Sequence, residues 1–289
     1  MKLHNPGWAT VVGLLLVTGL AAQTQQPPQQ PQPPKTQEQA AAEAEQRQAL
    51  QAINQASGPE ELTAHIEEFL QKYPESRYAW TLCQRASDAF RQLRNYDKAI
   101  EYGERAIALN PQDPIAYILV ADSLVEGTPP NQPDFEKVTH AEKYARKALE
   151  LLPAYFATWQ PSPTLTPEEI EERKKLFQAQ PHATLGYIHL LRRETALAEQ
   201  ELVQATELSQ SQPNPMDFLR LGIAYHRQQK YGPAVAVFRK TVAMGGPLYE
   251  YAQQYLQMAE EALAKSQPSA PAPPEDQPPT PKPPEPPQP

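Results

Sequence analysis

The sequence predicts an all-α protein in which pairs of antiparallel helices stack side by side into a solenoid, with one inserted helix and a C-terminal capping helix. The first observation behind this prediction is a spacing of twelve residues between small side chains, which occurs three times. The pairs are Ser87 with Ala99, Gly186 with Ala198, and Gly222 with Ala234. The second observation is a bulky side chain three positions after each first small residue, namely Phe90, His189 and Tyr225.

The small residues explain why the helices would pair. They let two antiparallel helices approach closely, and the bulky side chains one turn away fill the space on either side. One such pair buries only part of its apolar surface, so neighbouring copies must stack. Short polar links at 94–96 and 229–231 are expected to turn the chain between helices. Pro111 and Pro153 are expected to end the second helices of their units.

The two ends of the chain are not expected to join this folded body. Residues 23–38 form a Gln/Pro-rich linker, and residues 266–289 form a Pro-rich tail with almost no large apolar side chain. Such segments cannot bury enough surface to offset the entropy lost on ordering, so we expect both to be disordered. The folded part is therefore expected to span residues 39–265, which is long enough for a repeat array.

Residues 1–22 have the pattern of a secretory signal peptide. Lys2 gives a positive start, an apolar run follows, and Ala21 and Ala22 are among the small residues that end it. The apolar run is shorter than the ~20 residues that cross a bilayer, which favours cleavage over an uncleaved anchor. The sequence thus predicts an exported protein of the periplasm. An extracellular protein and one tethered to the membrane by its N-terminus are the alternatives.

The charge of the chain argues against a nucleic-acid partner. With 26 basic and 34 acidic residues the net charge is −8, and loss of Lys2 with the signal segment would leave 25 minus 34, or −9. Without a basic cluster, we expect neither nucleic acid nor an anionic membrane surface as the partner. A protein or peptide is the expected partner, and self-association is a further possibility. The single cysteine, Cys83, cannot form an internal disulfide, so packing alone must stabilise the fold.

No group of residues in the sequence points to catalysis, a cofactor or a metal. Cys83 falls where a buried core residue is expected. His182 and His189 share a helix face, but no Cys, Asp or Glu stands at the short spacing typical of zinc sites. The eleven glycines do not cluster into a phosphate-binding loop. We therefore expect a protein that is not an enzyme and that has no cofactor.

The stretch NYDKAIEYGERAIALNP, residues 95–111, resembles the second helix of a tetratricopeptide repeat, a family whose unit is 34 residues long. The resemblance implies a right-handed superhelical solenoid whose first helices line a concave face, where peptides usually dock. The expected copies are 80–113, 114–155, 179–212 and 215–248, with a degenerate copy at 43–76 and the capping helix at 247–265.

Two insertions depart from the regular repeat. About eight extra residues lie between the helices of the 114–155 copy, and a longer insertion covers residues 156–178. Thr166 and Glu169 have the spacing of a capping box, so an inserted helix should begin at Pro167. This helix is interpreted either as packing across a repeat junction or as an arm that extends a binding surface.

The resemblance also implies which residues would bind a partner. The positions that match the family's groove are occupied by Asp88, Arg91, Asp122, Tyr187, Leu190, Ile223, His226 and Arg227. Such a groove would be charged at its N-terminal end and apolar at its C-terminal end. Family members that grip a terminal carboxylate use Lys, Asn and Arg at these places, so the residues present here do not form that clamp. The capping helix or the inserted helix covering the apolar end is the alternative to an open groove.

The function that follows is a non-catalytic scaffold or adaptor of the bacterial envelope, which binds a protein or peptide partner on its concave face. Two other classes of function remain open from the sequence. One is a structural subunit that self-associates through an open end of the solenoid. The other is an accessory subunit that captures substrate for an envelope enzyme.

Overall fold

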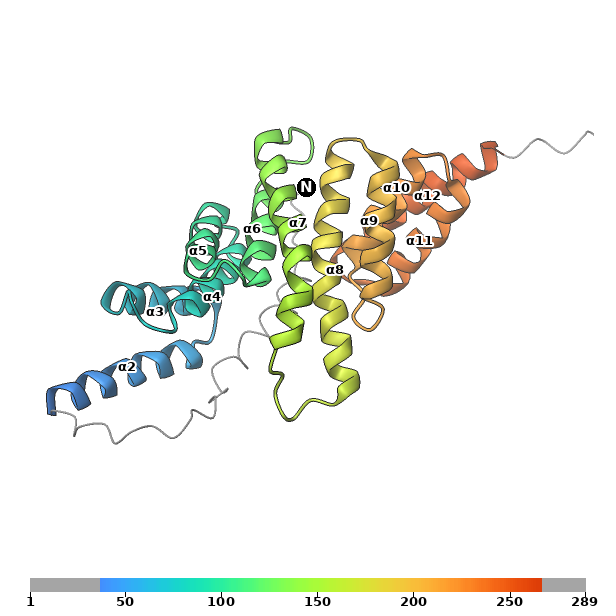
Figure 1. Ribbon diagram of the computed structural model, residues 1–289. Helices are drawn as coiled ribbons and strands as arrows, with labels where there is room; N and C mark the ends of the chain where they lie inside the picture. Colours follow the sequence, from blue (N-terminus) through green and yellow to red (C-terminus); the bar gives the residue numbers. More distant parts are fainter. Residues whose placement is uncertain (1–36, 267–289) are drawn as a thin grey trace, which may run out of the picture.

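The computed structural model of the chain describes residues 37–266, and every regular element in this range is helical (Figure 1). The elements are α2 (Gln37–Gln55), α3 (Pro59–Lys72), α4 (Ala79–Gln92), α5 (Tyr96–Leu109), α6 (Pro114–Glu126), α7 (Phe135–Thr158), α8 (Pro167–Leu191), α9 (Thr195–Leu208), α10 (Pro215–Arg227), α11 (Tyr231–Met244), the 3-10 helix η2 (Gly246–Leu248) and α12 (Tyr249–Ser266). The expected signal peptide, the expected linker up to residue 36 and the tail from residue 267 lie outside the described residues. Residues 37 and 38, expected in the linker, belong to α2.

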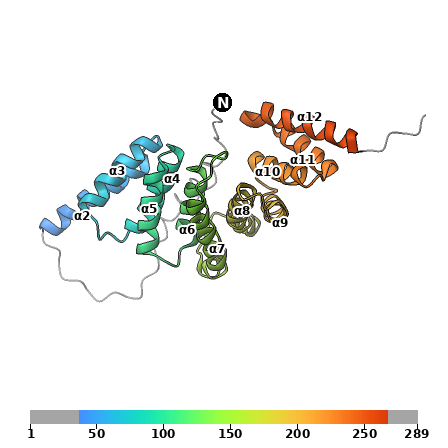
Figure 2. The same cartoon turned by 90° about the horizontal axis from the view of Figure 1, so that it is seen from above.

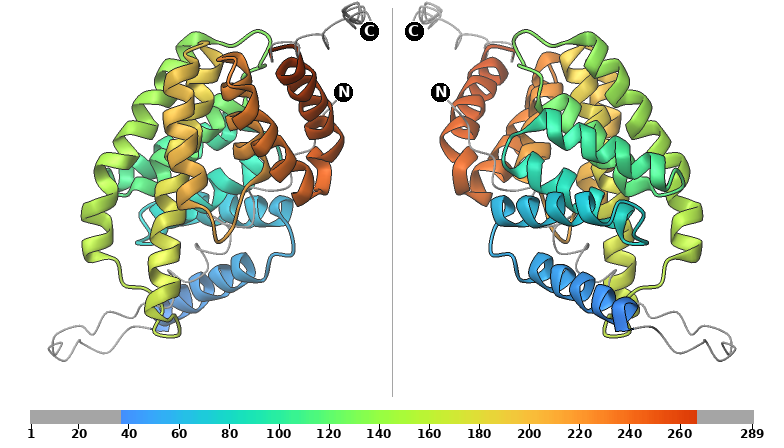
Figure 3. Two further views of the ribbon diagram at one scale, coloured as in Figure 1. Left: turned by 90° about the vertical axis from the view of Figure 1, so that its right-hand side faces the viewer. Right: turned by 90° about the vertical axis from the view of Figure 1, so that its left-hand side faces the viewer.

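Neighbouring helices pair as hairpins, and the hairpins stack in order along the chain. α4 packs on α5, α6 on α7, α8 on α9 and α10 on α11, and each hairpin contacts the next. The first helices of these hairpins, α4, α6, α8 and α10, also contact one another in order, and α10 contacts α12. The array curves, with these first helices on its inner side (Figure 2), and end-on views show the hairpins wound around a common axis (Figure 3). The fold is the predicted all-α solenoid of helix hairpins.

The hairpins close at the small residues that the sequence singles out. A Cβ atom on Gly222 would lie 2.4 Å from Cε1 of Phe238, and one on Gly186 would lie 2.5 Å from Cγ of Leu202. These distances are far below ordinary van der Waals contact, so the two helices approach more closely than any side chain at these positions would allow. Gly222 therefore lies where two helices meet, as the twelve-residue spacing predicts.

Three hairpins have the same type of turn between their two helices. Arg94, Arg193 and Gln229 each adopt the left-handed backbone conformation, with φ of 59°, 62° and 61°. The amide of the following residue donates to a carbonyl five positions earlier, as Lys230 does to Tyr225 at 3.0 Å. This Schellman-type arrangement fixes the point at which the second helix begins, and hence the register between the two helices.

Pro153 does not end its helix, contrary to the expectation from sequence. α7 continues through Pro153 to Thr158, and α8 likewise contains Pro181 in its interior. An internal proline costs ~3 kcal/mol or more, because it removes one backbone hydrogen bond and crowds the preceding turn. In α7 the turn after the proline makes aromatic contacts with α8 that offset this cost. The ring centroids of Tyr155, Phe156 and Trp159 lie 6.2, 6.2 and 6.3 Å from that of Phe177.

The expected inserted helix is not a separate element but the N-terminal part of α8. The predicted capping box is present: Thr166 Oγ1 accepts from the Glu169 amide at 3.2 Å, and the Glu169 carboxylate accepts from the Thr166 amide at 2.8 Å. Phe177 from this segment is buried in one cluster with Ile115 and Leu119 of α6. The segment therefore packs across the junction between two hairpins, and with the end of α7 it forms a long hairpin (Figure 1).

Gly222→Ala should destabilise the protein by ~1–3 kcal/mol, because the added methyl group must displace the Phe238 ring in a packed core. Gly232→Ala is the matched control, since a Cβ atom there meets nothing within 4 Å. The control should stabilise the protein by at most ~1 kcal/mol, the gain of replacing a helical glycine with alanine. Urea unfolding followed by circular dichroism measures both changes. Equal effects of the two substitutions would show that the register of this hairpin is wrong.

Candidate functional site

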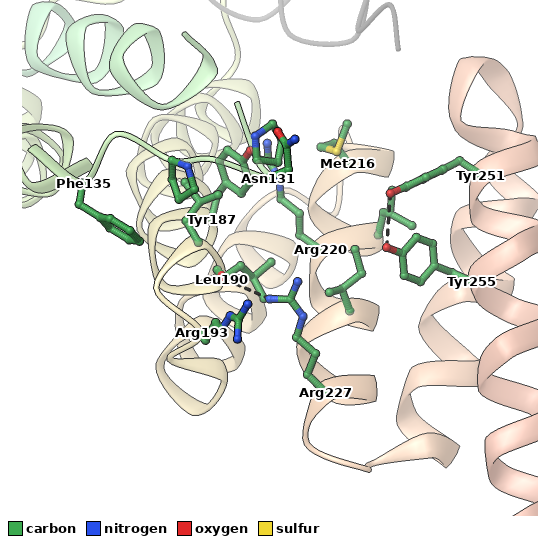
Figure 4. Close-up of a pocket in the computed structure, with 15 residues that line it drawn as sticks. Asn131, Phe135, Tyr187, Leu190, Arg193, Met216, Arg220, Arg227, Tyr251 and Tyr255 are labelled. Atoms are coloured by element: carbon green, nitrogen blue, oxygen red, sulfur yellow. Dashed lines mark hydrogen bonds between the residues drawn. The ribbon is translucent and has the colours of Figure 1, made fainter. Parts of the chain in front are cut away.

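A groove of about 670 Å³ opens on the inner side of the C-terminal half of the array (Figure 4). Four separate parts of the chain line it: the segment between α6 and α7, the C-terminal end of α8, helix α10, and helix α12. Sites of this size hold several side chains of a bound segment or one small molecule. The groove is therefore a candidate binding site, built by elements that are distant in the sequence.

The floor of the groove is apolar and comes from α8 and α10. Leu190 and Leu219 are buried there, whereas Tyr187 and Ile223 are only half-buried and reach the groove. Spacings of three and four residues place these side chains on the faces of α8 and α10 that turn toward the inner side. The guanidinium carbon of Arg220 lies 3.9 Å from the centre of the Tyr187 ring, a cation–π contact that holds both side chains in place.

The extra residues between α6 and α7 form one wall of the groove. The segment between α6 and α7 brings Pro130, Asn131 and Pro133 to the groove, and Phe135 follows at the first turn of α7. Phe135 is 54% exposed, so a large apolar ring remains accessible at this wall. The insertion that breaks the regular repeat length thus contributes directly to the site.

The capping helix forms another wall and does not cover the groove. Tyr251 and Tyr255 of α12 line it, with their hydroxyl oxygens 3.3 Å apart and their ring centroids 5.0 Å apart. Burial and the hydrogen bond with Tyr255 raise the pKa of Tyr251 to about 12, so this hydroxyl stays neutral and can bind a polar group. Among the described residues that line the groove, none comes from the insertion at 156–178. Neither helix therefore covers the apolar end.

The charged residues expected at the N-terminal end of the concave face are buried. Asp88, Arg91 and Asp122 are 2%, 5% and 3% exposed. Arg91 of α4 donates to Asp88 at 3.0 Å and to Glu126 of α6 at 3.2 Å, and Asp122 accepts a hydrogen bond from Thr184 of α8. The expectation that these residues present charge to a ligand is wrong, because the inner helices enclose them and they bond to residues of α4, α6 and α8 instead.

Two buried carboxyl groups on the inner helices have pKa values raised to about 7. Burial is the cause at Asp122, and the nearby Arg91 offsets it only in part. Burial also raises the pKa of Asp217 on α10, against the opposing charge of Arg220. One oxygen of Asp217 has no hydrogen-bond partner among the described residues, and the nearest nitrogen of Arg220 lies 3.8 Å from it. Ionisation of either carboxyl group therefore destabilises the folded protein.

The structure brings half of the sequence-predicted binding residues to the groove. The four residues that line it are Tyr187, Leu190, Ile223 and Arg227. His226 is not among them, because its ring packs edge-on against Tyr231 of α11 at 5.4 Å between ring centroids. Its neighbour Arg227 lines the groove and donates to the Leu190 carbonyl at 3.0 Å.

Several residues of the groove were not predicted from the sequence. Arg220 precedes Arg227 by seven positions, so both lie on one helix face, and this spacing is a signal that could have found it. Arg193 is the left-handed residue of the turn between α8 and α9. Tyr251 and Tyr255 are one turn apart on α12, but their place in the groove depends on how that helix packs, which spacing alone does not give.

The histidine and cysteine side chains considered from the sequence as candidates for chemistry are engaged in packing or pairing. Within residues 37–266, no three His, Cys, Asp or Glu side chains converge so as to hold a metal ion. His182 and His189 are each 2.6 Å from a glutamate oxygen, in Glu201 and Glu194. Cys83 is buried in the core, and burial raises the pKa of its thiol to about 11. The described part of the chain contains no helix that is long and apolar enough to span a membrane.

Comparison with known proteins identifies the repeat. The sequence model of the tetratricopeptide repeat family matches residues 80–113, which form the α4–α5 hairpin. No curated protein sequence matches the chain. Among solved structures, the chain is similar to a thermophilic TPR protein of Thermus thermophilus. The two chains are 16% identical, the match covers 77% of this chain and 98% of that one, and the TM-score is 0.46.

Residues 80–113 form a tetratricopeptide repeat. The matched hairpin shares its left-handed turn and its close helix approach with the α8–α9 and α10–α11 hairpins, so the repeat extends beyond the matched residues. Domains of this family bind proteins or peptides and are typically non-catalytic scaffolds.

Asp217→Asn should reduce the loss of stability that accompanies rising pH. The folded pKa of Asp217 is about 7 and lies above the ~3.9 of an unfolded aspartate, so the folded protein binds more protons between these values. The stabilisation that protonated Asp217 gives to the folded protein is therefore complete below pH ~4. It is lost as the pH rises through 7, by up to ~1.4 kcal/mol per pH unit. Urea unfolding at about pH 5 and about pH 8 measures the difference in the free energy of unfolding. A difference equal to that of the wild type would show that Asp217 does not titrate in this range.

Proposed function

We propose that this chain is a non-catalytic scaffold or adaptor that binds a segment of a partner protein in the groove between α8, α10 and α12. The observation that carries the proposal is an accessible apolar and aromatic groove on the inner side of the array. Its floor and one of its walls are held in place by contacts within the chain. Arg220 stacks on Tyr187, and the hydroxyl groups of Tyr251 and Tyr255 meet. A site that is built before the partner arrives loses little entropy on binding.

The groove contains the residue types that dominate binding energy at protein interfaces. Tyrosine and arginine are enriched among residues whose truncation costs ~2 kcal/mol or more. Tyr187, Tyr251 and Tyr255 supply amphipathic rings, and Leu219 and Ile223 supply the apolar surface between them. A volume of about 670 Å³ fits several side chains of a short segment rather than a whole domain. The partner therefore inserts a short segment with an apolar anchor.

We further propose that the protein acts in the bacterial envelope, in the periplasm. The support for this location is the pattern of residues 1–22, in which an apolar run follows Lys2 and ends in small residues. These residues lie outside the described part of the chain. An exported adaptor with proline-rich segments on both sides of its folded body suits a role in tethering or spacing other envelope proteins.

Tyr187→Ala should weaken binding of a partner captured from the native envelope fraction by ~2 kcal/mol or more, roughly thirtyfold in Kd. The reason is that the substitution removes an anchor ring and also frees Arg220. Tyr249→Ala is the matched control, because Tyr249 is 41% exposed at the start of α12 and does not line the groove. Isothermal titration calorimetry measures both affinities, with circular dichroism to confirm that each variant is folded. Unchanged affinity in a folded Tyr187→Ala variant would exclude the groove as the binding site.

N-terminal sequencing of the native protein should find a start near Ala22 or Gln23, because small residues end the apolar run there. The protein should also appear in the periplasmic fraction after osmotic shock. A native protein that retains Met1 or Lys2 would contradict the cleavage on which the proposed location depends.

A further inference from the structure

This inference rests on the proposed function and concerns the chemistry of the partner segment. Three arginines line the groove, Arg193, Arg220 and Arg227, and no Asp or Glu is among the described residues that line it. The chain as a whole has 34 acidic residues against 26 basic ones. Positive charge is thus gathered at one concave surface of an acidic protein, where it can attract an anionic group.

These three guanidinium groups are not neutralised by carboxylates within hydrogen-bond distance in the described part of the chain. Arg227 donates to the Leu190 carbonyl at 3.0 Å, which is a neutral acceptor. The nearest approach of Arg220 to a carboxylate is 3.8 Å, to Asp217, which is too long for a hydrogen bond. Arg193 forms no ion pair with any residue in the range 37–266. Donor groups for an anionic ligand are therefore available in the groove.

Some arginines elsewhere on the surface are paired within the chain. Arg192, the neighbour of Arg193, pairs with Glu142 of α7. Arg239 of α11 pairs with Glu260 of α12 at 2.7 Å. The groove differs from these surface positions in that three arginines gather there with no carboxylate among its lining residues.

The apolar surface beside the arginines decides which kind of anion fits. A small inorganic or organic anion would leave the exposed faces of Tyr187, Ile223 and Tyr255 in contact with water, at a cost of ~25 cal/mol per Å² of apolar surface left uncovered. Three arginines in so short a groove would also contact few phosphates of a nucleic acid, whose affinity depends on many such contacts. A polypeptide with acidic side chains next to a large apolar one covers both kinds of surface.

We propose that the groove binds a segment of a separate protein in which Asp or Glu residues flank an apolar anchor. The anchor packs between Tyr187 of α8 and Tyr255 of α12, and its flanking carboxylates bind Arg220 and Arg227. Arg193 contributes from the rim. Arg220 has the strongest effect, because its side chain is only 14% exposed and a charged hydrogen bond shielded from water contributes more than an exposed one.

A random peptide library displayed on phage and selected on the full chain tests this proposal. The selected peptides should be enriched in Asp and Glu next to Leu, Phe or Trp, and their affinity should fall as NaCl is added. In fluorescence anisotropy, Arg220→Gln should weaken binding by roughly tenfold or more, and the exposed Arg193→Gln and Arg227→Gln by a few fold each. Arg239→Gln, on the outer helix α11, is the matched control and should leave the affinity unchanged.

The outcomes distinguish the proposed acidic chemistry of the partner segment from the proposed binding function of the groove. Selected peptides that lose affinity on Tyr187→Ala but carry no excess of acidic residues would overturn this inference and leave the proposed function standing. Failure to select any peptide, or peptides that bind Tyr187→Ala as well as the wild type, would remove both. If peptides are selected only after residues 267–289 are deleted, that segment with its Glu275, Asp276 and Glu285 is the occupant, and a separate partner is excluded.

Discussion

The close approach of two helices at positions with little or no side chain is the constraint on which the rest of the structure depends. Neither Gly186 nor Gly222 has room for a Cβ atom, and at the equivalent place in the α4–α5 hairpin the Ser87 hydroxyl donates to the Ala99 carbonyl at 2.7 Å. Because these hairpins close at equivalent points and turn through a left-handed residue, they present equivalent faces and stack in register. The stacking in turn sets the spacing of α4, α6, α8 and α10, and hence the shape of the inner side.

That packing gives the inner side two regions with different properties. In the N-terminal region, α4, α6 and α8 enclose Asp88, Arg91 and Asp122. Arg91 and Asp122 bond across the helices, so these buried groups help to fix how neighbouring hairpins pack. In the C-terminal region, the long α6–α7 connection and the capping helix stand beside α8 and α10 as walls. The side chains between those walls remain accessible. The departures from the regular repeat are thus what produce a groove at this end.

Most of the fold could be predicted from the sequence, because the signals for hairpins are local. The spacing from Gly222 to Ala234 and the capping box at Thr166 each depend on residues within a dozen positions. The prediction failed at Pro153, where contact with the distant Phe177 outweighs the local tendency to end a helix. In the site, the resemblance to the repeat family placed Tyr187 and Ile223 on the inner face. The burial of Asp122 and the walls supplied by Phe135 and Tyr251 depend on contacts between hairpins, which no pattern within a single helix contains.

Hydrogen exchange of the full chain, with and without a bound acidic peptide, tests most directly whether a partner occupies the groove. Exchange should slow in residues 187–193, 216–227 and 249–255, which supply the floor and walls, as partner contacts exclude water from these helices. The outer helices α9 and α11 should exchange as they do in the free protein. Protection confined to the outer helices, or to α2 and α3, would contradict a partner site between α8, α10 and α12.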